Sequence, residues 1–365
     1  MRSNQTIAFR TKVVSVLVAL IAIAMVALLG ACGGSNTTTT ETASGNGTTA
    51  TTAPPTAEPV TWTMGHMGAA DFVYQLVGEV LRDELDERTG GMVILQIKGA
   101  GALGDESGTL ELYKSGDMQV GVHISGAVGA LFPQFGFLST PFLFDSEEHW
   151  AAVQQSDEGH AYWNGLLEEN NAAFRVGAIA CMGARNLYSK DPVATIDDLQ
   201  GLKLRIVENP VASDIWKAIG SVPIALPFSE VYSALQTGMI NAADNSPTGY
   251  THFSHQEVAK NYLETEHEYS TAFMFVSKEA YDALSPELQE QVDAAFMVAQ
   301  ESWLGFREEQ DAEIIANFDK WGVVVTQPSS QLIQDIKTRI QPVIDKTVEA
   351  QGMQGFMELV EAKRK

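Results

Sequence analysis

The stretch VTWTMGHMGAADFVYQLVGEVLRDELDERTGGMVILQIK, residues 60–98, decides the fold. Its first five residues have the short apolar pattern of a strand, and apolar residues from Phe72 to Leu85 recur on one helical face. Gly90 and Gly91 end this helix, and apolar and polar residues then alternate up to residue 98. The stretch therefore predicts a strand, a helix and a second strand.

The same alternation continues beyond this stretch. A glycine-rich loop, a helix near 109–115 and an apolar strand at 118–124 complete a βαβαβ unit, which predicts an α/β fold with a largely parallel sheet. A second α/β region begins near Gly183, and Pro286 starts a helical pattern that runs to about residue 320. Further elements are expected as strands at 202–207 and 322–325, and as helices at 211–219, 228–237 and 330–361.

The N-terminus has the pattern of an export signal. Three cations precede an apolar run at residues 13–29, and the sequence LGAC at 29–32 resembles a bacterial lipobox. We expect residues 1–31 to be a lipoprotein signal peptide and Cys32 to carry the lipid. Residues 32–59 are expected to be a flexible tether, because they are mostly Gly, Ser, Thr, Ala and Pro. An uncleaved anchor helix is the alternative, and both readings place the bulk of the protein outside the cytoplasm.

Composition and charge restrict the class of protein. A chain of 365 residues with 45% hydrophobic residues has room for two packed domains. A net charge of -23 argues against nucleic acid as a partner, because that partner needs a basic surface. A lipid on Cys32 leaves Cys181 without a disulfide partner, and we expect Cys181 to be a buried small hydrophobe.

A glycine motif suggests a nucleotide site but does not complete it. Residues 99–104 match the G-x-G-x-x-G fingerprint after an expected strand. A dinucleotide site needs an acid at the end of the following strand, where Ile124 and Ser125 stand instead. We therefore expect a tight turn and no cofactor.

Catalytic and metal motifs are also missing. His252, His255 and His267 lack a cysteine or acid with convincing ligand spacing, so we expect surface or capping histidines and no metal site. The chain has no Gly-x-Ser-x-Gly elbow and no recognisable Cys-His spacing. No catalytic residue is assigned, and an enzyme is not expected.

Two arginines stand out. Arg205 lies inside a strand pattern, where a charge is costly to bury without a partner, and Arg185 follows an apolar run. A guanidinium is planar and can bind both oxygens of a carboxylate. Spacing alone leaves a second interpretation open, in which Arg205 pairs with Asp244 and Arg185 is a solvated charge at a strand end.

Several segments in order resemble the DctP-type solute-binding proteins of TRAP (tripartite ATP-independent periplasmic) transporters. They are GLKLR at 201–205, EVYSALQTG at 230–238, DNSP at 244–247 and PFLF at 141–144. The resemblance extends over about residues 60–359. It implies a two-lobed periplasmic-binding-protein-like fold with a hinge, and a long helix after Pro286 that crosses both lobes. The lobes implied are 60–182 plus about 271–310, and 183–270 plus about 311–365.

The resemblance also implies a binding site. The family's strand arginine, matching Arg205, pairs with the ligand carboxylate. Residues matching Arg185 and Asn245 add hydrogen bonds, and the one matching Phe228 lines the pocket. An acid at Glu208 is unusual, and it either accepts from a hydroxyl or amine of the ligand, helps to hold a cation, or points to solvent.

Smaller departures and candidates complete the set. Ala243 and Asp244 stand where the family commonly has Gln and Glu. His66 and Ser125 are weaker candidates for contact with the ligand.

The sequence thus predicts a protein that captures a small organic acid and delivers it to integral membrane TRAP transporter subunits. It is expected to be lipid-anchored, on the cell membrane or facing the periplasm. The alternatives are a binding protein of an ATP-driven importer and an exported hydrolase.

Overall fold

The computed structural model describes residues 58–364, so the expected signal peptide, Cys32 and nearly all of the tether lie outside the described residues. Within this range the chain forms one nine-stranded sheet in the order β2-β1-β3-β8-β4-β7-β5-β6, with β9 paired to β8. The strands are β1 (Val60–Gly65), β2 (Val93–Lys98), β3 (Val120–Ile124), β4 (Phe174–Ser189), β5 (Lys203–Ile206), β6 (Val222–Ala225), β7 (Ala242–Asn245), β8 (Asn261–Ser277) and β9 (Val324–Thr326).

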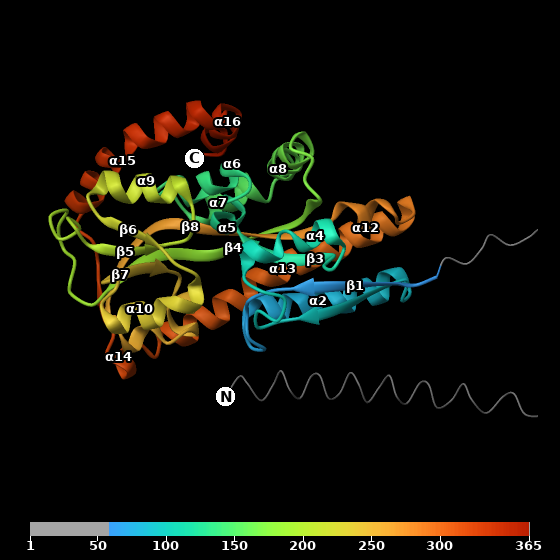
Figure 1. Ribbon diagram of the computed structural model, residues 1–365, viewed down its shortest axis with the longest axis horizontal. Coiled ribbons are helices and arrows are strands. Elements are labelled where there is room, and N and C mark those ends of the chain that lie inside the picture. The colour runs from blue at the N-terminus through green and yellow to red at the C-terminus, as the bar shows by residue number, and fades with distance from the viewer. Residues whose placement is uncertain (1–57, 365) are drawn as a thin grey trace, which may run out of the picture. The chain divides into compact units, whose positions relative to one another are not determined.

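Helices cover both faces of this sheet (Figure 1). The longer ones are α2 (Val73–Thr89), α7 (Glu147–Gln154), α8 (Asp157–Glu169), α9 (Pro210–Ile219), α10 (Val231–Thr237), α13 (Pro286–Ile315), α15 (Ser330–Gln351) and α16 (Gln354–Lys363). The short ones are α3 (Glu106–Thr109), α4 (Leu112–Ser115), α5 (Ser125–Val128), α6 (Pro133–Gly136), α11 (Pro247–His252), α12 (Lys278–Asp282) and α14 (Phe318–Trp321). Three 3-10 turns lie at η1 (Phe137–Ser139), η2 (Phe228–Glu230) and η3 (His255–Glu257).

The first α/β unit follows the sequence closely. β1 pairs in parallel with both β2 and β3, which confirms the parallel βαβαβ prediction. Leu81 and Leu85 of α2 are fully buried, as the apolar stripe predicts. The single helix expected at 109–115 is wrong in detail, because the chain forms two short helices, α3 and α4, instead.

The two longest strands, β4 and β8, are antiparallel and run together across the described part of the molecule (Figure 1). Neither strand was expected at this length. Most of their residues are buried on both faces, so the alternation that marks a half-exposed strand is missing. The lobe boundaries expected at 182/183 and 270/271 both fall inside these strands, and they stay a prediction.

Residues of β4 divide between two apolar cores. Ala178 and Ala180 pack with α2 and α13 on one face, whereas Ile179 and Cys181 pack with α7, α8 and α16 on the other. A register shift between Val176 and Ala178 changes which face each residue takes. Such a division follows from the two-residue period of side chains in a strand.

Gly177, at this shift, has a specific steric role. A Cβ built at Gly177 would lie 2.6 Å from a ring carbon of Phe296 in α13. Only glycine therefore allows the helix to approach the strand this closely.

We call the part of the sheet around β1, β2 and β3 the first lobe, and the part around β5, β6 and β7 the second lobe. In the second lobe, α9 and α15 pack on one face while α10, α11 and α14 pack on the other. Helix α13 contacts α2 in the first lobe and α11 in the second, so it crosses both as expected. It ends at Ile315, before the expected residue 320, and the separate helix α14 follows.

The mixed α/β class is therefore confirmed. Within residues 58–364, no helix combines the length and the apolar character needed to cross a membrane.

Candidate functional site

A cavity of about 340 Å³ lies between side chains of the two lobes. Tyr74 and Glu106 line it from the first lobe, and Arg205, Phe228 and His252 line it from the second. Several of these residues follow the carboxyl ends of parallel strands, where open α/β sheets bind their ligands. The volume is in the range of pockets that hold small molecules.

Arg205 projects from β5 to the cavity wall and is 4% exposed. Its Nε and Nη2 atoms donate to the carbonyl oxygen of Leu226 at 3.1 and 3.0 Å. Its guanidinium carbon lies 5.5 Å from the ring centre of Phe228. No carboxylate within residues 58–364 forms an ion pair with it, so the alternative pairing of Arg205 with Asp244 is wrong.

The surroundings of Arg205 destabilise its positive charge. Burial, followed by the positive charge of Arg185, lowers the pKa of Arg205 to about 10. The side chain remains cationic at neutral pH. A bound anion would stabilise its positive charge and so oppose both effects.

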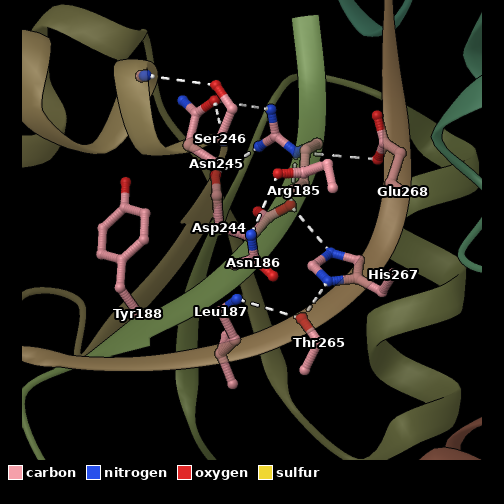
Figure 2. Close-up of polar contacts among 12 residues, drawn as sticks. Arg185, Asn186, Leu187, Tyr188, Asp244, Asn245, Ser246, Thr265, His267 and Glu268 are labelled. Carbon is pink, nitrogen blue, oxygen red and sulfur yellow. Dashed lines mark hydrogen bonds and ion pairs between the residues drawn. The ribbon is translucent and has the colours of Figure 1, made fainter. Parts of the chain in front are cut away.

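Arg185 is the arginine that pairs with Asp244 (Figure 2). Its Nε atom lies 2.7 Å from Oδ2 of Asp244, Nη2 donates to the backbone oxygen of the same residue, and Nη1 donates to Asn245 Oδ1 at 3.4 Å. Arg185 lines the cavity but is 6% exposed. The interpretation of Arg185 as a solvated strand-end charge is therefore wrong, because the antiparallel register of β4 and β7 brings the acid beside it.

Three more side chains complete this buried network. Nε2 of His267 lies 3.2 Å from Asp244 Oδ2, and its Nδ1 lies 2.7 Å from the Thr265 hydroxyl (Figure 2). A carboxylate oxygen of Glu268 lies 3.9 Å from Arg185 Nε.

Two carboxyls of the network have opposite pKa shifts. Burial alone would raise the pKa of Asp244, but Arg185 and His267 hold it well below its usual range. Burial raises the pKa of Glu268 to about 8, opposed by Arg185 and reinforced by the charge of Asp244.

Glu106 is a cavity residue that was not expected from the sequence. It begins α3, directly after the glycine turn at 99–104, and its Oε2 accepts from the backbone N–H of Ile124 at 3.1 Å. Burial raises its pKa to about 7, opposed by this hydrogen bond and by Arg205. The available signal was its place after the carboxyl end of a parallel strand. The glycine motif itself forms a turn, with φ of 69° at Gly101 and 118° at Gly104.

The remaining expected site residues divide into two groups. Asn245, Phe228 and Glu208 all line the cavity. Ser125 lines only a small adjoining cavity of about 20 Å³, which has room for a single water molecule. His66 does not line the main cavity, because its ring bonds Gln75 Oε1 at 3.1 Å instead.

Two of the three histidines considered for metal binding are buried, which corrects the expectation of surface or capping roles. His255 is fully buried, with Nδ1 2.8 Å from the Tyr188 hydroxyl, and His267 belongs to the network around Asp244. His252 lies on the cavity wall, its ring centre 4.4 Å from that of Phe72. Within the described range, no three His, Cys, Asp or Glu residues are grouped as metal ligands would be.

Cys181 lies in β4 and is buried, as expected. Burial raises the pKa of this thiol well above its usual value.

Two lobes joined by continuous strands, with an arginine at the wall of the cavity between them, define a solute-binding protein of the two-lobed class. Residues 64–351 match the family described as bacterial extracellular solute-binding protein, family 7. The chain belongs to this DctP family.

Relatives and solved structures agree with this assignment. A solute-binding protein of Sulfitobacter sp. (strain NAS-14.1) is 31% identical over 56% of this chain and 62% of its own length. One from Chromohalobacter salexigens is 30% identical over 76% of this chain and 77% of its own length. The crystal structure of a TRAP periplasmic solute-binding protein from Sulfitobacter sp. NAS-14.1, with bound β-D-galacturonate, has a TM-score of 0.77 at 27% identity, covering 83% of this chain and all of that one. The two-lobed fold expected from the sequence is thereby confirmed.

Proposed function

We propose that this protein captures a sugar acid with a single carboxylate, binds that carboxylate through Arg205, and delivers the solute to a TRAP-type membrane transporter. The observation that carries the proposal is a buried guanidinium on the cavity wall without an ion-pair partner among the described residues. The carbonyl oxygen of Leu226 accepts from the N–H of Arg205 Nε and from one of the two N–H groups of Nη2. Three N–H groups remain on the Nη1 and Nη2 end, enough for a two-point contact with a carboxylate.

A single carboxylate fits the charges better than two. Arg185 is already neutralised by Asp244, so among residues 58–364 the wall offers one arginine without an ion-pair partner, Arg205. Three acids, Asp105, Glu106 and Glu208, line the same cavity and disfavour a second anionic group. Carboxylates can instead accept hydrogen bonds from hydroxyl groups, which a sugar acid carries in number. The galacturonate bound by the Sulfitobacter protein has this chemistry.

The other contacts follow from position on the wall. Asn245 supplies a hydrogen bond beside the carboxylate, Phe228 covers an apolar face of the sugar ring, and Glu208 accepts from a hydroxyl. We assign Ser125 and His66 no direct contact, because neither lines the main cavity.

Melting temperatures with D-galacturonate, D-galactose and the dicarboxylate galactarate test the choice of solute. The acid should raise the melting temperature, because a solute that binds only the folded state stabilises it. The neutral sugar should have no effect, and galactarate should have a smaller effect than galacturonate. An equal response to galactose, or no response to any sugar acid, would contradict the proposal.

We also propose that residues 1–31 are removed and that Cys32 carries a lipid. Radiolabelled palmitate should enter the wild-type protein in cells but not Cys32→Ser. Equal labelling of both would exclude this anchor. Delivery to a TRAP-type transporter predicts adjacent genes for two integral membrane subunits, and an adjacent ATPase gene in their place would contradict it.

A further inference from the structure

Resting on the proposed function, we propose that capture of the solute anion is coupled to the uptake of one proton by Glu106. The coupling follows from the balance of charge around the cavity. Its walls and the adjoining network contain two guanidinium groups, Arg185 and Arg205, and, besides the exposed acids Asp105 and Glu208, three acids, Glu106, Asp244 and Glu268. A bound carboxylate would be a fourth acid enclosed with the same two cations.

Within residues 58–364, Asp244 and Glu268 form ion pairs with Arg185, whereas Glu106 forms an ion pair with neither arginine. Asp244 and Arg185 are joined at 2.7 Å, and Asp244 also bonds His267. In the described part of the chain, a single hydrogen-bond donor contacts the Glu106 carboxylate, the N–H of Ile124. The cation that stabilises its charge is Arg205, acting through space.

The solute would therefore compete with Glu106 for the same charge. A carboxylate bound to Arg205 offsets the positive field that Glu106 depends on and adds a negative charge in the same cavity. Both effects favour the protonated form of Glu106. Its pKa of about 7 in the empty cavity means that a modest rise suffices for proton uptake at neutral pH.

Other groups facing Glu106 do not take up this proton. Tyr74 from α2 has its pKa raised well above 10 by burial, and burial lowers the pKa of His123 from β3 to about 4. Burial also lowers the pKa of His252 on α11, which disfavours protonation of this ring. Tyr74 and His123 keep their charge state between pH 7 and 8.5.

The acids Asp105 and Glu208 also line the cavity, and both are exposed. Each has access to water, which screens its response to an anion. Glu268 lines the small adjoining cavity and not the main one, and its charge is compensated by Arg185 at 3.9 Å. Helices α4 and α5 contribute no ionisable side chain to the lining of the main cavity.

The coupling has a measurable size. If Glu106 has a pKa near 7 when empty and well above 8 when the solute is bound, affinity falls by roughly twentyfold from pH 6.5 to 8.5. Glu106→Gln resembles the protonated form, so it should bind at pH 8.5 about as tightly as the wild type does at pH 6.5, with little pH dependence.

Two measurements test the proposal. Carboxyl 13C NMR of the unliganded protein, assigned with Glu106→Gln, should show Glu106 titrating near pH 7. An ordinary midpoint near 4.5 overturns the proposal whether or not any solute binds. Calorimetry with D-galacturonate at pH 7.5, in buffers of different ionisation enthalpy, should show uptake of about 0.7 proton per solute, and about none in Glu106→Gln.

The controls separate the possible failures. Glu111→Gln removes an exposed acid that pairs with Lys114 outside the cavity, and it should keep the proton uptake. Binding without proton uptake overturns the coupling alone, and uptake that persists in Glu106→Gln but disappears in Glu268→Gln overturns its assignment to Glu106. Failure of every sugar acid to bind at any pH contradicts the proposed function. It also contradicts the coupling to solute, even if NMR shows that Glu106 titrates near pH 7.

Discussion

Replacing Arg205 with alanine should remove most of the affinity for a sugar acid. The change leaves the solute carboxylate in the cavity without its cation, and it also removes both donors to the Leu226 carbonyl. Truncating one partner of a buried, hydrogen-bonded charge pair costs about 2–5 kcal/mol. The dissociation constant should therefore rise by roughly thirtyfold to several thousandfold.

Arg205→Lys separates charge from geometry. The arginine donates to Leu226 along one edge and keeps a second edge for the cavity. A lysine ammonium cannot supply both edges, because it is a single point of charge on a flexible stem. We expect at least about a tenfold weaker affinity, or roughly 1.4 kcal/mol.

Isothermal titration calorimetry with D-galacturonate at pH 6.5 measures both effects. Arg88→Ala is a matched control, because it removes the same charge from an i,i+4 ion pair of α2. Thermal unfolding of each variant shows whether it is folded before binding is compared. Near-normal affinity in folded Arg205→Ala would refute the reasoning, because a second cation would then have to hold the carboxylate.

Three further outcomes are expected. Arg185→Ala should lower the free energy of unfolding by about 3–5 kcal/mol in urea titrations, because it leaves Asp244 buried and charged, and a loss under 1 kcal/mol would contradict this. Between pH 7.5 and 8.5, above the range in which unfolded histidines titrate, the melting temperature should fall, because Glu106 and Glu268, with pKa values raised to about 7 and about 8, bind their protons more tightly folded than unfolded; a rise over this range would contradict the assignment. Cys181 should resist a thiol reagent at pH 8 until the protein is unfolded, and rapid labelling of the native protein would show that the thiol is accessible.

The sequence predicts elements well where one face meets water. Helix α2 has a one-sided apolar stripe, so both its existence and its end at Gly90 could be predicted. Strands β4 and β8 could not, because burial on both faces removes the alternation that identifies a strand.

The site was predictable only in part. Arg205 is conspicuous because a charge inside a strand pattern demands a partner or a ligand. Asp244 pairs with Arg185 because of the register between β4 and β7. The two residues are some sixty positions apart in the sequence, so no local sequence pattern predicts the pairing. Glu106 was missed because an acid at the start of a helix is commonplace and stabilising in itself.

The continuous pair β4 and β8 has a consequence for how the solute is released. Any change in the angle between the lobes must bend two strands that stay hydrogen-bonded to each other. Bending is easiest where the hydrogen-bond register between the two strands shifts. Two such register shifts flank Arg185, at Cys181/Ala184 and at Arg185/Leu187. Arg185, which holds Asp244, lies between these two shifts, so a bend of the strands at this point would carry a residue of the cavity wall with it.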